Sequence, residues 1–310
     1  MKSDEVKKSA KGLARRIVLG VAIIVLFASA AFLINHYIIE PYKYICNNRE
    51  TSVTNESDTQ TTVIGSEGDT TVNIQAKYSA LLRQNPEFVG KLYISAIDDA
   101  GFNVVQADDN SKYLTTGFKG ETTRYGTLFV DYRNNIEKLD TNTIIYGHNM
   151  RDGSQLGSLS LYNNIDNYKS FPVIEFNTIY GNCKWKVFAA FITNSEKKED
   201  NGYVFPYLTT EFKSDEVFMR FIDAVKERSY YTNDAVDIIA GDKILTLSTC
   251  DTVFHEARFV VMARLVRDGE SAEVDVSRAV KNENQRFPQA WYDKKGKSNP
   301  FKNTADFTLD

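Results

Sequence analysis

The chain has 310 residues, 42% of them hydrophobic and 12% aromatic, which is enough for one large core or two small ones. Residues 1–16 carry six Lys or Arg against two Asp or Glu, so the remainder holds 31 basic and 39 acidic residues. That acidic excess argues against a nucleic-acid partner. Three cysteines are too few for a disulfide framework, and three scattered histidines do not form a metal site, so we expect neither.

Residues 17–39 form an apolar stretch directly after this basic N-terminus. Residues 17–34 carry no charge, and about 20 such residues are needed to cross a bilayer. The positive flank, residues 1–16, should stay in the cytoplasm, which predicts a single-pass protein of the cell membrane with its C-terminal bulk outside. A cleaved signal peptide is the alternative, because Ala28-Ser29-Ala30 resembles a cleavage site. The apolar run continues to Ile34, so we favour an uncleaved signal anchor.

Residues 40–76 are predicted to form an extracellular tether. From Asn47 onward the segment is rich in Thr, Ser, Asn, Asp and Glu and shows no apolar period, so we expect it to be flexible and solvated. The globular domain should then occupy residues 77–267, beginning with a short helix that ends at Pro86.

Strand-like segments separated by turn-rich loops fill this domain. They occupy residues 92–97, 103–106, 127–132, 143–146, 173–176 and 185–193, followed by the runs 243–250 and 258–266. Such a series predicts an all-β barrel or sandwich.

One helix interrupts the strands, at residues 214–228. Five apolar side chains recur there at helical spacing, with acidic residues in the first turn and basic residues in the last: Val217, Phe218, Phe221, Ile222 and Val225. This stripe is most simply a packing face, so a functional role must come from the preceding loop. That loop, residues 203–210, is predicted to be a preformed wall of a binding groove, with Tyr203, Phe205, Tyr207 and Leu208 governing recognition. After Arg267 the chain turns polar, and we expect residues 268–310 to be a mostly disordered tail.

Cys250 and Arg258 are the first candidates for catalysis. Cys250 ends one β-type run and Arg258 opens the next, and the short polar connection between them predicts an antiparallel hairpin. A thiol at one strand end then lies beside a guanidinium at the start of its neighbour. A thiolate nucleophile needs such a partner if a substrate carbonyl or an oxyanion is to be held next to it. The alternative is a half-buried cysteine and a surface arginine without function.

A histidine is the usual proton donor for the amine that leaves when a thiolate attacks an amide. His148 follows the strand at 143–146, and His255 lies in the predicted hairpin loop. His36 belongs to the membrane interface and is not a candidate. Spacing alone does not choose between His148 and His255.

Two motifs together resemble the class B sortases. They are Thr246-Leu247-Ser248-Thr249-Cys250, with Arg258 on the following strand, and Ile145-Tyr146-Gly147-His148-Asn149-Met150 about a hundred residues upstream. The resemblance covers roughly residues 77–266 and includes weaker matches at 85–90, 105–110, 131–134 and 153–159. The helix at 214–228 fits class B in particular, and the signal anchor and tether fit too.

The resemblance implies a mainly β fold: an eight-stranded sortase β-barrel with peripheral helices, a long helix inserted before the cysteine strand, and an N-terminal transmembrane helix. It also implies a membrane-anchored cysteine transpeptidase. Such an enzyme cleaves a C-terminal sorting signal of the N-P-x-T-x kind after threonine, forms a thioacyl intermediate, and transfers it to a peptidoglycan amine. No cofactor is required.

The resemblance also assigns roles to residues. Cys250 is the nucleophile, His148 protonates the leaving amine, and Arg258 holds the substrate carbonyl or oxyanion. Arg264 lies on the same strand face as Arg258, but six residues of strand place it about 20 Å away. Five further residues match positions that line the substrate groove: Asn110, Leu114, Tyr146, Ser248 and Thr249. Core packing is the alternative for Leu114 and Tyr146.

Three rival functions stay open at this point. In a pilin-polymerising sortase, a pilin lysine would replace the peptidoglycan amine. In a cysteine peptidase, water would resolve the thioacyl intermediate. In a non-catalytic, membrane-tethered binding module, Cys250 would be structural and inert toward thiol reagents.

Overall fold

The structure is a computed structural model that describes residues 2–49, 60–64 and 71–310. The chain divides into two compact units at Glu50, which we describe separately. The N-terminal unit is helical throughout its described part: α1 (Lys2–Ile34), the π-helix η1 (Asn35–Ile39) and α2 (Glu40–Arg49).

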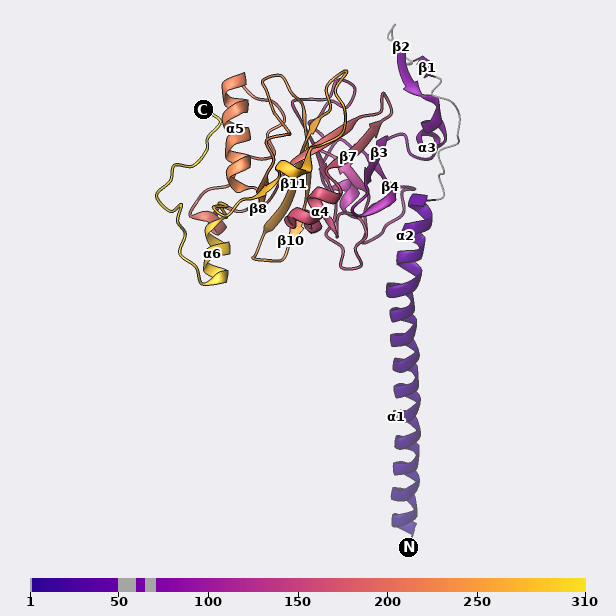
Figure 1. The fold of residues 1–310 in the computed structure, drawn as a ribbon. Helices are drawn as coiled ribbons and strands as arrows, with labels where there is room; N and C mark the ends of the chain where they lie inside the picture. The colour runs from indigo at the N-terminus through magenta and orange to yellow at the C-terminus, as the bar shows by residue number, and fades with distance from the viewer. Residues whose placement is uncertain (1, 50–59, 65–70) are drawn as a thin grey trace. The chain divides into compact units, whose positions relative to one another are not determined.

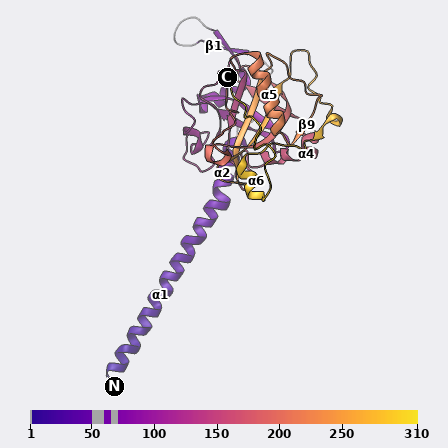
Figure 2. The same ribbon diagram turned by 90° about the vertical axis from the view of Figure 1, so that its left-hand side faces the viewer.

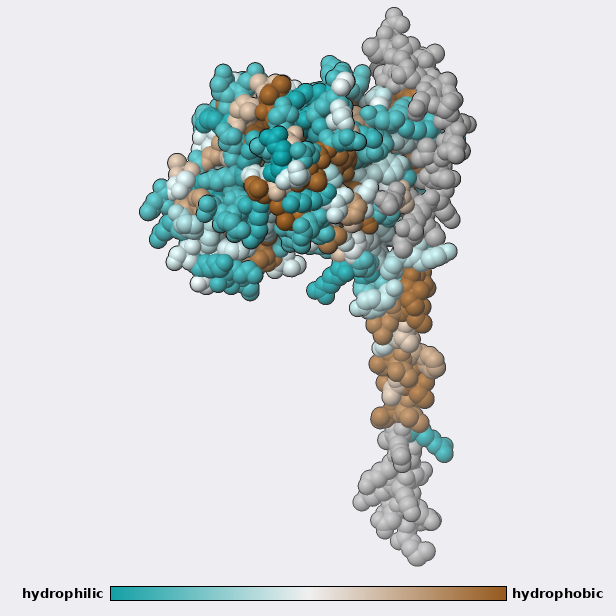
Figure 3. All heavy atoms as spheres, in the orientation of Figure 1, coloured by the Kyte–Doolittle hydropathy of each residue, from teal (hydrophilic) through white to brown (hydrophobic). Residues whose placement is uncertain are grey.

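The segment Arg16–Tyr44 of this unit is long and apolar enough to cross a membrane. Its apolar side chains are exposed along the whole segment, and hydrophobic residues cover the visible face of the helix in Figure 3. Apolar surface of this kind is unfavourable in water and favourable in lipid. The helix predicted at residues 17–39 is therefore present, and its insertion in a membrane stays a prediction.

The predicted tether, residues 40–76, is described in part. Residues 40–49 belong to α2, and β1 (Gln60–Ile64) pairs antiparallel with β2 (Thr71–Gln75). Residues 50–59 and 65–70 lie outside the described residues, so their flexibility stays a prediction. The described parts differ from the expected irregular chain. The two short segments are rich in Thr, Val and Ile, which favour strands. The Gln75 main-chain N–H also donates to the carbonyl of Ile179, at 2.8 Å.

Eight strands close a barrel in the order β10-β11-β8-β7-β3-β4-β5-β6, which confirms the predicted mainly β barrel (Figure 1). Their bounds are β3 (Phe88–Ile94), β4 (Asp98–Val105), β5 (Leu128–Val130), β6 (Asn142–Tyr146), β7 (Val173–Thr178), β8 (Lys184–Asn194), β10 (Ile244–Asp251) and β11 (Ala257–Leu265). The β10·β6 and β4·β5 pairs are parallel, and the other pairs of the barrel are antiparallel.

Alternation along β10 and β11 separates the inside of the barrel from the outside. Leu245, Leu247 and Val261 belong to the cluster that fills the barrel, whereas Ile244 and Met262 belong to a second cluster outside it. The face that carries Cys250 is therefore the outer face of the barrel.

Short helices and a further strand pair surround the barrel. They are η2 (Ala76–Tyr78), α3 (Ser79–Gln84), η3 (Lys112–Leu114), η4 (Leu159–Asn163), α4 (Ile165–Ser170), η5 (Lys197–Asp200), α5 (Asp215–Arg228), η6 (Val276–Arg278) and α6 (Gln289–Lys295), with β9 (Tyr231–Thr232) paired to β12 (Val280–Lys281). The predicted helices at the start of the domain and at 214–228 are both present as α3 and α5.

Helix α5 lies on the outside of the barrel (Figures 1 and 2), and its buried side chains belong to the outer cluster. The Ser214 hydroxyl caps its first turn by accepting from the Val217 N–H, as a serine at this position commonly does. All five residues of the predicted stripe are buried, which confirms the stripe as a packing face.

The C-terminal segment, residues 268–310, is ordered, so the expectation of a disordered tail is wrong. It contains η6, β12 and α6, and its side chains contact residues of the barrel domain. Glu270 accepts from Arg264 at 2.6 and 2.7 Å, and the ring of Phe307 lies 6.0 Å from that of Phe205. The polar composition misleads because this segment has no core of its own. It forms a layer on a core that other elements supply.

Candidate active site

A cavity of about 520 Å³ opens where β6 and β10 end. All eight residues predicted for the site line it, together with four others: Asn110, Leu114, Tyr146, His148, Ser248, Thr249, Cys250 and Arg258, and then Phe129, Gly147, Tyr207 and Leu208. The chain thus brings residues from six separate segments to one hollow. The two residues left open as core packing, Leu114 and Tyr146, are 40% exposed and half-buried respectively and face this hollow.

Cys250 and Arg258 are direct cross-strand partners, as the predicted hairpin requires. Cys250 is exposed, and Arg258 donates to the Ala257 carbonyl at 3.0 Å and to Glu256 Oε2 at 2.7 Å. Burial alone would lower the pKa of Arg258, but the Cys250 thiolate and the Glu256 carboxylate outweigh burial and raise it. A fixed positive charge therefore stands beside the thiol.

Glu256 holds the guanidinium from the hairpin turn, and sequence reasoning missed it. Its φ of 54° is in the left-handed region, which non-glycine residues seldom adopt. The carboxylate also accepts from the Ser195 hydroxyl at 2.8 Å, so it connects the end of β8 to Arg258. No spacing rule marks such a residue, because its role depends on the turn conformation.

His148 contacts the segment that precedes β5: its Nε2 is 2.7 Å from the carbonyl oxygen of Leu114. A carbonyl only accepts, so Nε2 carries a hydrogen and donates it. Within the described residues Nδ1 makes no hydrogen bond, which leaves it available for proton transfer. Gly147 precedes His148 because a Cβ there would lie 2.8 Å from Leu156 Cγ.

His255, the other histidine that spacing left open, does not line the cavity. Its side chain is 64% exposed, and its Nδ1 lies 3.5 Å from Glu199 Oε1. Glu196, Glu199 and His255 are grouped closely enough to suggest metal ligands, but the Lys198 ammonium already pairs with Glu196 at 2.6 Å. None of these three residues lines the cavity.

Three bonds tie the end of β10 to the loop after β6. Asn149 Nδ2 donates to the Cys250 carbonyl at 2.7 Å, Thr249 Oγ1 donates to the Gly147 carbonyl at 2.8 Å, and the Gly147 N–H donates to the Ser248 carbonyl at 3.3 Å. Cys250 and His148 are therefore held in one frame although 102 residues separate them. Asn149 was not predicted as a site residue, and only its place in the His148 motif pointed to it.

Asp131 organises a second part of the lining. It accepts from Asn110 Nδ2 at 3.1 Å and from the Tyr146 hydroxyl at 2.8 Å, and Arg133 pairs with it at 2.8 Å. Burial alone would raise the pKa of Asp131, but Arg133 above all, together with the Tyr146 hydroxyl, lowers it to about 2. Arg133 Nη2 also donates to the Leu208 carbonyl at 3.0 Å, so one guanidinium joins two parts of the lining.

The predicted wall at residues 203–210 is only partly a wall. Tyr207 and Leu208 line the cavity, whereas Phe205 is 1% exposed and packs beneath α5 in the outer cluster. The Tyr207 hydroxyl lies 3.0 Å from Ser248 Oγ, and burial raises the pKa of Tyr207. The hydroxyl of Ser248 is thus engaged inside the protein.

Arg264, which shares a strand face with Arg258, is fully buried and pairs with Ile244 on β10 at the far end of the hairpin. Its guanidinium donates hydrogen bonds to Glu270 and to the Leu265 carbonyl. Arg264 therefore supports the fold and does not reach the cavity.

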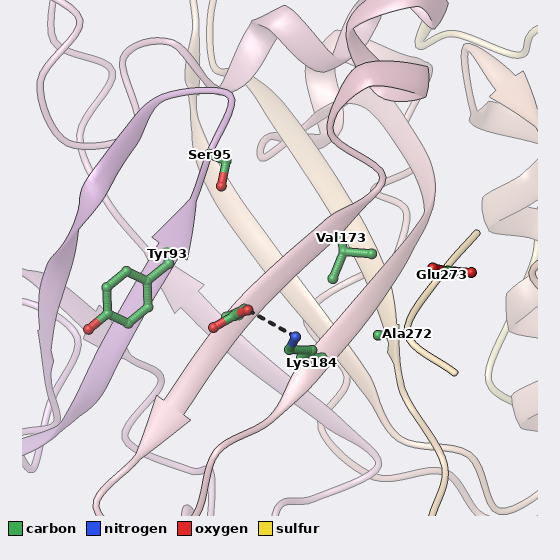
Figure 4. A pocket seen from close by; sticks show the side chains of 7 residues that line it. Tyr93, Ser95, Val173, Lys184, Ala272 and Glu273 are labelled. Carbon is green, nitrogen blue, oxygen red and sulfur yellow. Dashed lines mark ion pairs between the residues drawn. The ribbon is translucent and has the colours of Figure 1, made fainter. Parts of the chain in front are cut away.

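A second hollow, of about 510 Å³, lies over β3, β7 and β8 (Figure 4). Its lining includes the Glu175–Lys184 ion pair, at 3.5 Å, and Figure 4 shows Lys184 between Tyr93 on one side and Glu273 on the other. Its lining includes neither cysteine nor histidine, so it lacks the thiol and the imidazole that a cysteine-dependent acyl transfer uses.

Comparison with known proteins shows which family the chain resembles. Residues 92–266 match the family described as the sortase domain. Sortase B of Listeria monocytogenes serovar 1/2a is 36% identical over 189 residues, which cover 60% of this chain and 72% of that protein.

Solved structures agree. A crystal structure of sortase B from B. anthracis in complex with AAEK1 aligns with a TM-score of 0.59 and 31% identity, over 74% of this chain and 99% of that one. A crystal structure of sortase B complexed with triglycine aligns with a TM-score of 0.55 and 32% identity, over 62% of this chain and 86% of that one.

Proposed function

Because the chain belongs to the sortase family and is a cysteine transpeptidase of the sortase B type, we propose that Cys250 is its nucleophile, His148 its general acid and base, and Arg258 its carbonyl-binding residue. The single observation that carries this assignment is that one cavity brings these three side chains together from β10, the loop after β6, and β11. Arg264 and His255, the rival residues, both lie outside that cavity.

The reaction begins when the Cys250 thiolate attacks the carbonyl carbon of the scissile amide. The carbonyl oxygen becomes an oxyanion, and the Arg258 guanidinium is placed to hold it, because Arg258 pairs with Cys250 across the hairpin and Glu256 fixes its guanidinium. Collapse of this intermediate breaks the C–N bond. His148 gives the leaving amine its proton, and a thioacyl enzyme remains.

A second amine then attacks the thioacyl carbonyl and expels the thiolate, while His148 accepts the proton of that amine. Nδ1 is the atom proposed to give and take these protons, since Nε2 is bonded to the Leu114 carbonyl in the free protein. That bond orients the ring in both protonation states, because Nε2–H is a donor in each.

The remaining lining residues divide by what their polar atoms already do. Ser248 and Thr249 are bonded to Tyr207 and Gly147, so they are proposed to position the strand end rather than to contact substrate. Leu114, Tyr146 and Leu208 offer apolar surface to the peptide. Asn110 is held by Asp131, which fixes it for a peptide contact.

We propose a C-terminal sorting signal of the N-P-x-T-x kind as the acyl donor and a peptidoglycan cross-bridge or precursor amine as the acceptor. The relative complexed with triglycine supports an amine of this kind. The apolar helix Arg16–Tyr44 supports a chain anchored in the cell membrane, with the barrel on the outer side.

The test uses the full chain in detergent with an N-P-x-T-x peptide and triglycine, and identifies the products by mass spectrometry. Wild type should join the peptide to triglycine after threonine, and Cys250→Ala should give no product. Cys183→Ala is the matched control, because Cys183 is half-buried at the turn after β7, where burial raises the pKa of its thiol.

The other outcomes separate the rival functions. Turnover by Cys250→Ala would remove Cys250 as the nucleophile. A hydrolysed peptide that triglycine does not divert would indicate a peptidase. Transfer to a lysine side chain but not to triglycine would indicate a pilin-polymerising enzyme.

A further inference from the structure

The segment after the matched sortase domain folds back onto the loop that supplies Tyr207 and Leu208. The domain match ends at residue 266, and the chain continues through η6, β12 and α6 to a C-terminus beside α5 (Figures 1 and 2). None of this segment lines the catalytic cavity. Its effect on the reaction must therefore pass through the residues that it contacts.

Phe307 is the main apolar contact of the segment with the loop. Its ring lies 6.0 Å from that of Phe205 and 5.9 Å from that of Phe221 on α5, and those two rings stack at 5.5 Å. The carbonyl of Phe307 accepts from the Tyr203 hydroxyl at 2.9 Å. Phe307 thus closes the outer side of a three-ring cluster whose other two members, Phe205 and Phe221, are buried.

Polar bonds hold the segment in place around Phe307. Arg286 pairs with Asp306 and donates to the Ala305 carbonyl at 3.2 Å. The Gln289 N–H donates to Asp200 Oδ1 at 2.8 Å, just before the loop begins. The Asp310 contacts with Lys213 and Arg220 are exposed, and exposed pairs contribute little.

The loop backbone connects Phe205 directly to Tyr207 and Leu208, which line the cavity. The Tyr207 N–H donates to the Phe205 carbonyl at 2.8 Å, and the Tyr207 hydroxyl lies 3.0 Å from Ser248 Oγ on the catalytic strand. Pro206 between them restricts the backbone further. A shift of Phe205 therefore displaces Tyr207 and Leu208 in the lining.

We propose that residues 268–310 form a strap that fixes the Tyr207–Leu208 part of the peptide groove, and that Phe307 is a positioning residue for peptide binding. The inference deepens the proposed function and rests on it for the identity of the peptide. The strap should act on the groove lining, whereas Cys250, His148 and Arg258 keep the bonds that Asn149, Leu114 and Glu256 make with them.

The test compares Phe307→Ala with wild type in the full chain. KM for the sorting peptide should rise about tenfold, within the range by which residues outside a site modulate binding. The kcat and the rate of Cys250 alkylation should stay the same. Phe301→Ala is the matched control, because Phe301 is an aromatic residue of the same segment that packs on Arg286 and not on the three-ring cluster.

A second pair of measurements keeps the test decisive if Phe307→Ala folds poorly. Tyr203→Phe removes only the hydroxyl bond to the Phe307 carbonyl and should raise KM by a smaller factor. Hydrogen exchange of the 203–210 amides should quicken in both variants. This readout does not depend on turnover, so it separates failure of the strap from failure of the proposed function.

An unchanged KM together with unchanged exchange at 203–210 in Phe307→Ala would overturn the proposal. An equal rise in KM in Phe301→Ala would show a general loosening of the segment and would overturn the role assigned to Phe307. A fall in kcat or in alkylation rate with KM unchanged would assign the segment to the catalytic geometry and also overturn it.

Discussion

The β10–β11 hairpin and the C-terminal segment support the same cavity by different kinds of contact. In the hairpin, Cys250 and Arg258 are eight residues apart and meet by strand pairing. In the C-terminal segment, Phe307 meets Phe205 across 102 residues of chain, through side-chain packing alone. The Cys250–Arg258 contact can be predicted from the sequence, because side chains alternate between the two faces of each strand. The second depends on how distant surfaces fit, and polar composition hides it.

The sharpest test of the hairpin side is the choice of histidine. His148→Ala should lower turnover by about a hundredfold or more, the low end for a general acid and base, whereas His255→Ala should lower it less than about tenfold. The reason is that His148 lines the cavity and His255 does not. Steady-state rates with one peptide would check this. A larger loss of turnover in His255→Ala than in His148→Ala would identify His255, in the hairpin turn, as the general acid.

Replacing the guanidinium should be the next largest effect. Arg258→Gln should lower kcat by about 10²-fold, the cost of one lost oxyanion donor in a preorganised site. Glu256→Gln keeps a hydrogen-bond acceptor beside Arg258 and should cost much less, which makes it the matched variant. If Glu256→Gln were as damaging as Arg258→Gln, the charge of the pair and not the placement of the guanidinium would be essential.

The C-terminal side can be tested through Glu270, which faces the buried Arg264. Glu270→Gln should lower the free energy of unfolding by about 3 kcal/mol, because it removes the nearer counter-charge of a buried guanidinium and leaves only Asp237, at 3.5 Å. Arg264 and Lys186 hold the pKa of Glu270 below its usual range. The contribution of the Glu270 carboxylate to the free energy of unfolding is therefore complete above the ordinary carboxyl pKa and is lost as pH falls below that value.

Denaturant unfolding of wild type and Glu270→Gln across that pH range would measure this difference. The two curves should differ near neutral pH and converge in acid. Glu273→Gln, a neighbouring exposed carboxylate, is the control and should match wild type throughout. A constant difference at every pH would mean that packing and not charge makes the contact.

The barrel and most of the cavity could be predicted because they follow from periodic patterns and from two motifs. The strand positions, the α5 stripe and the Cys250–Arg258 pairing needed only alternation and spacing. None of these three features depends on packing between segments that are far apart in the sequence. Assigning His148 over His255 needed the resemblance, since both are polar residues near strand ends.

The remaining features depend on three-dimensional fit. Glu256 matters because of its left-handed backbone conformation, and Asn149 because its amide reaches the Cys250 carbonyl. Phe205 was expected in the groove wall, yet the neighbouring cluster buries it. Residues 268–310 lack an apolar period because only a few of their side chains, Phe307 among them, enter a core.

Arg133 gives the groove a fixed aperture. Its guanidinium donates to the Asp131 carboxylate, which in turn accepts from Asn110 and Tyr146. The same guanidinium donates to the main-chain carbonyl of Leu208. A guanidinium is planar and rigid, so the separation between these parts of the lining is set by one internal spacer and not by two independent loops. Side chains of a bound peptide would therefore be selected by thickness as well as by chemistry, before the scissile bond reaches the thiol.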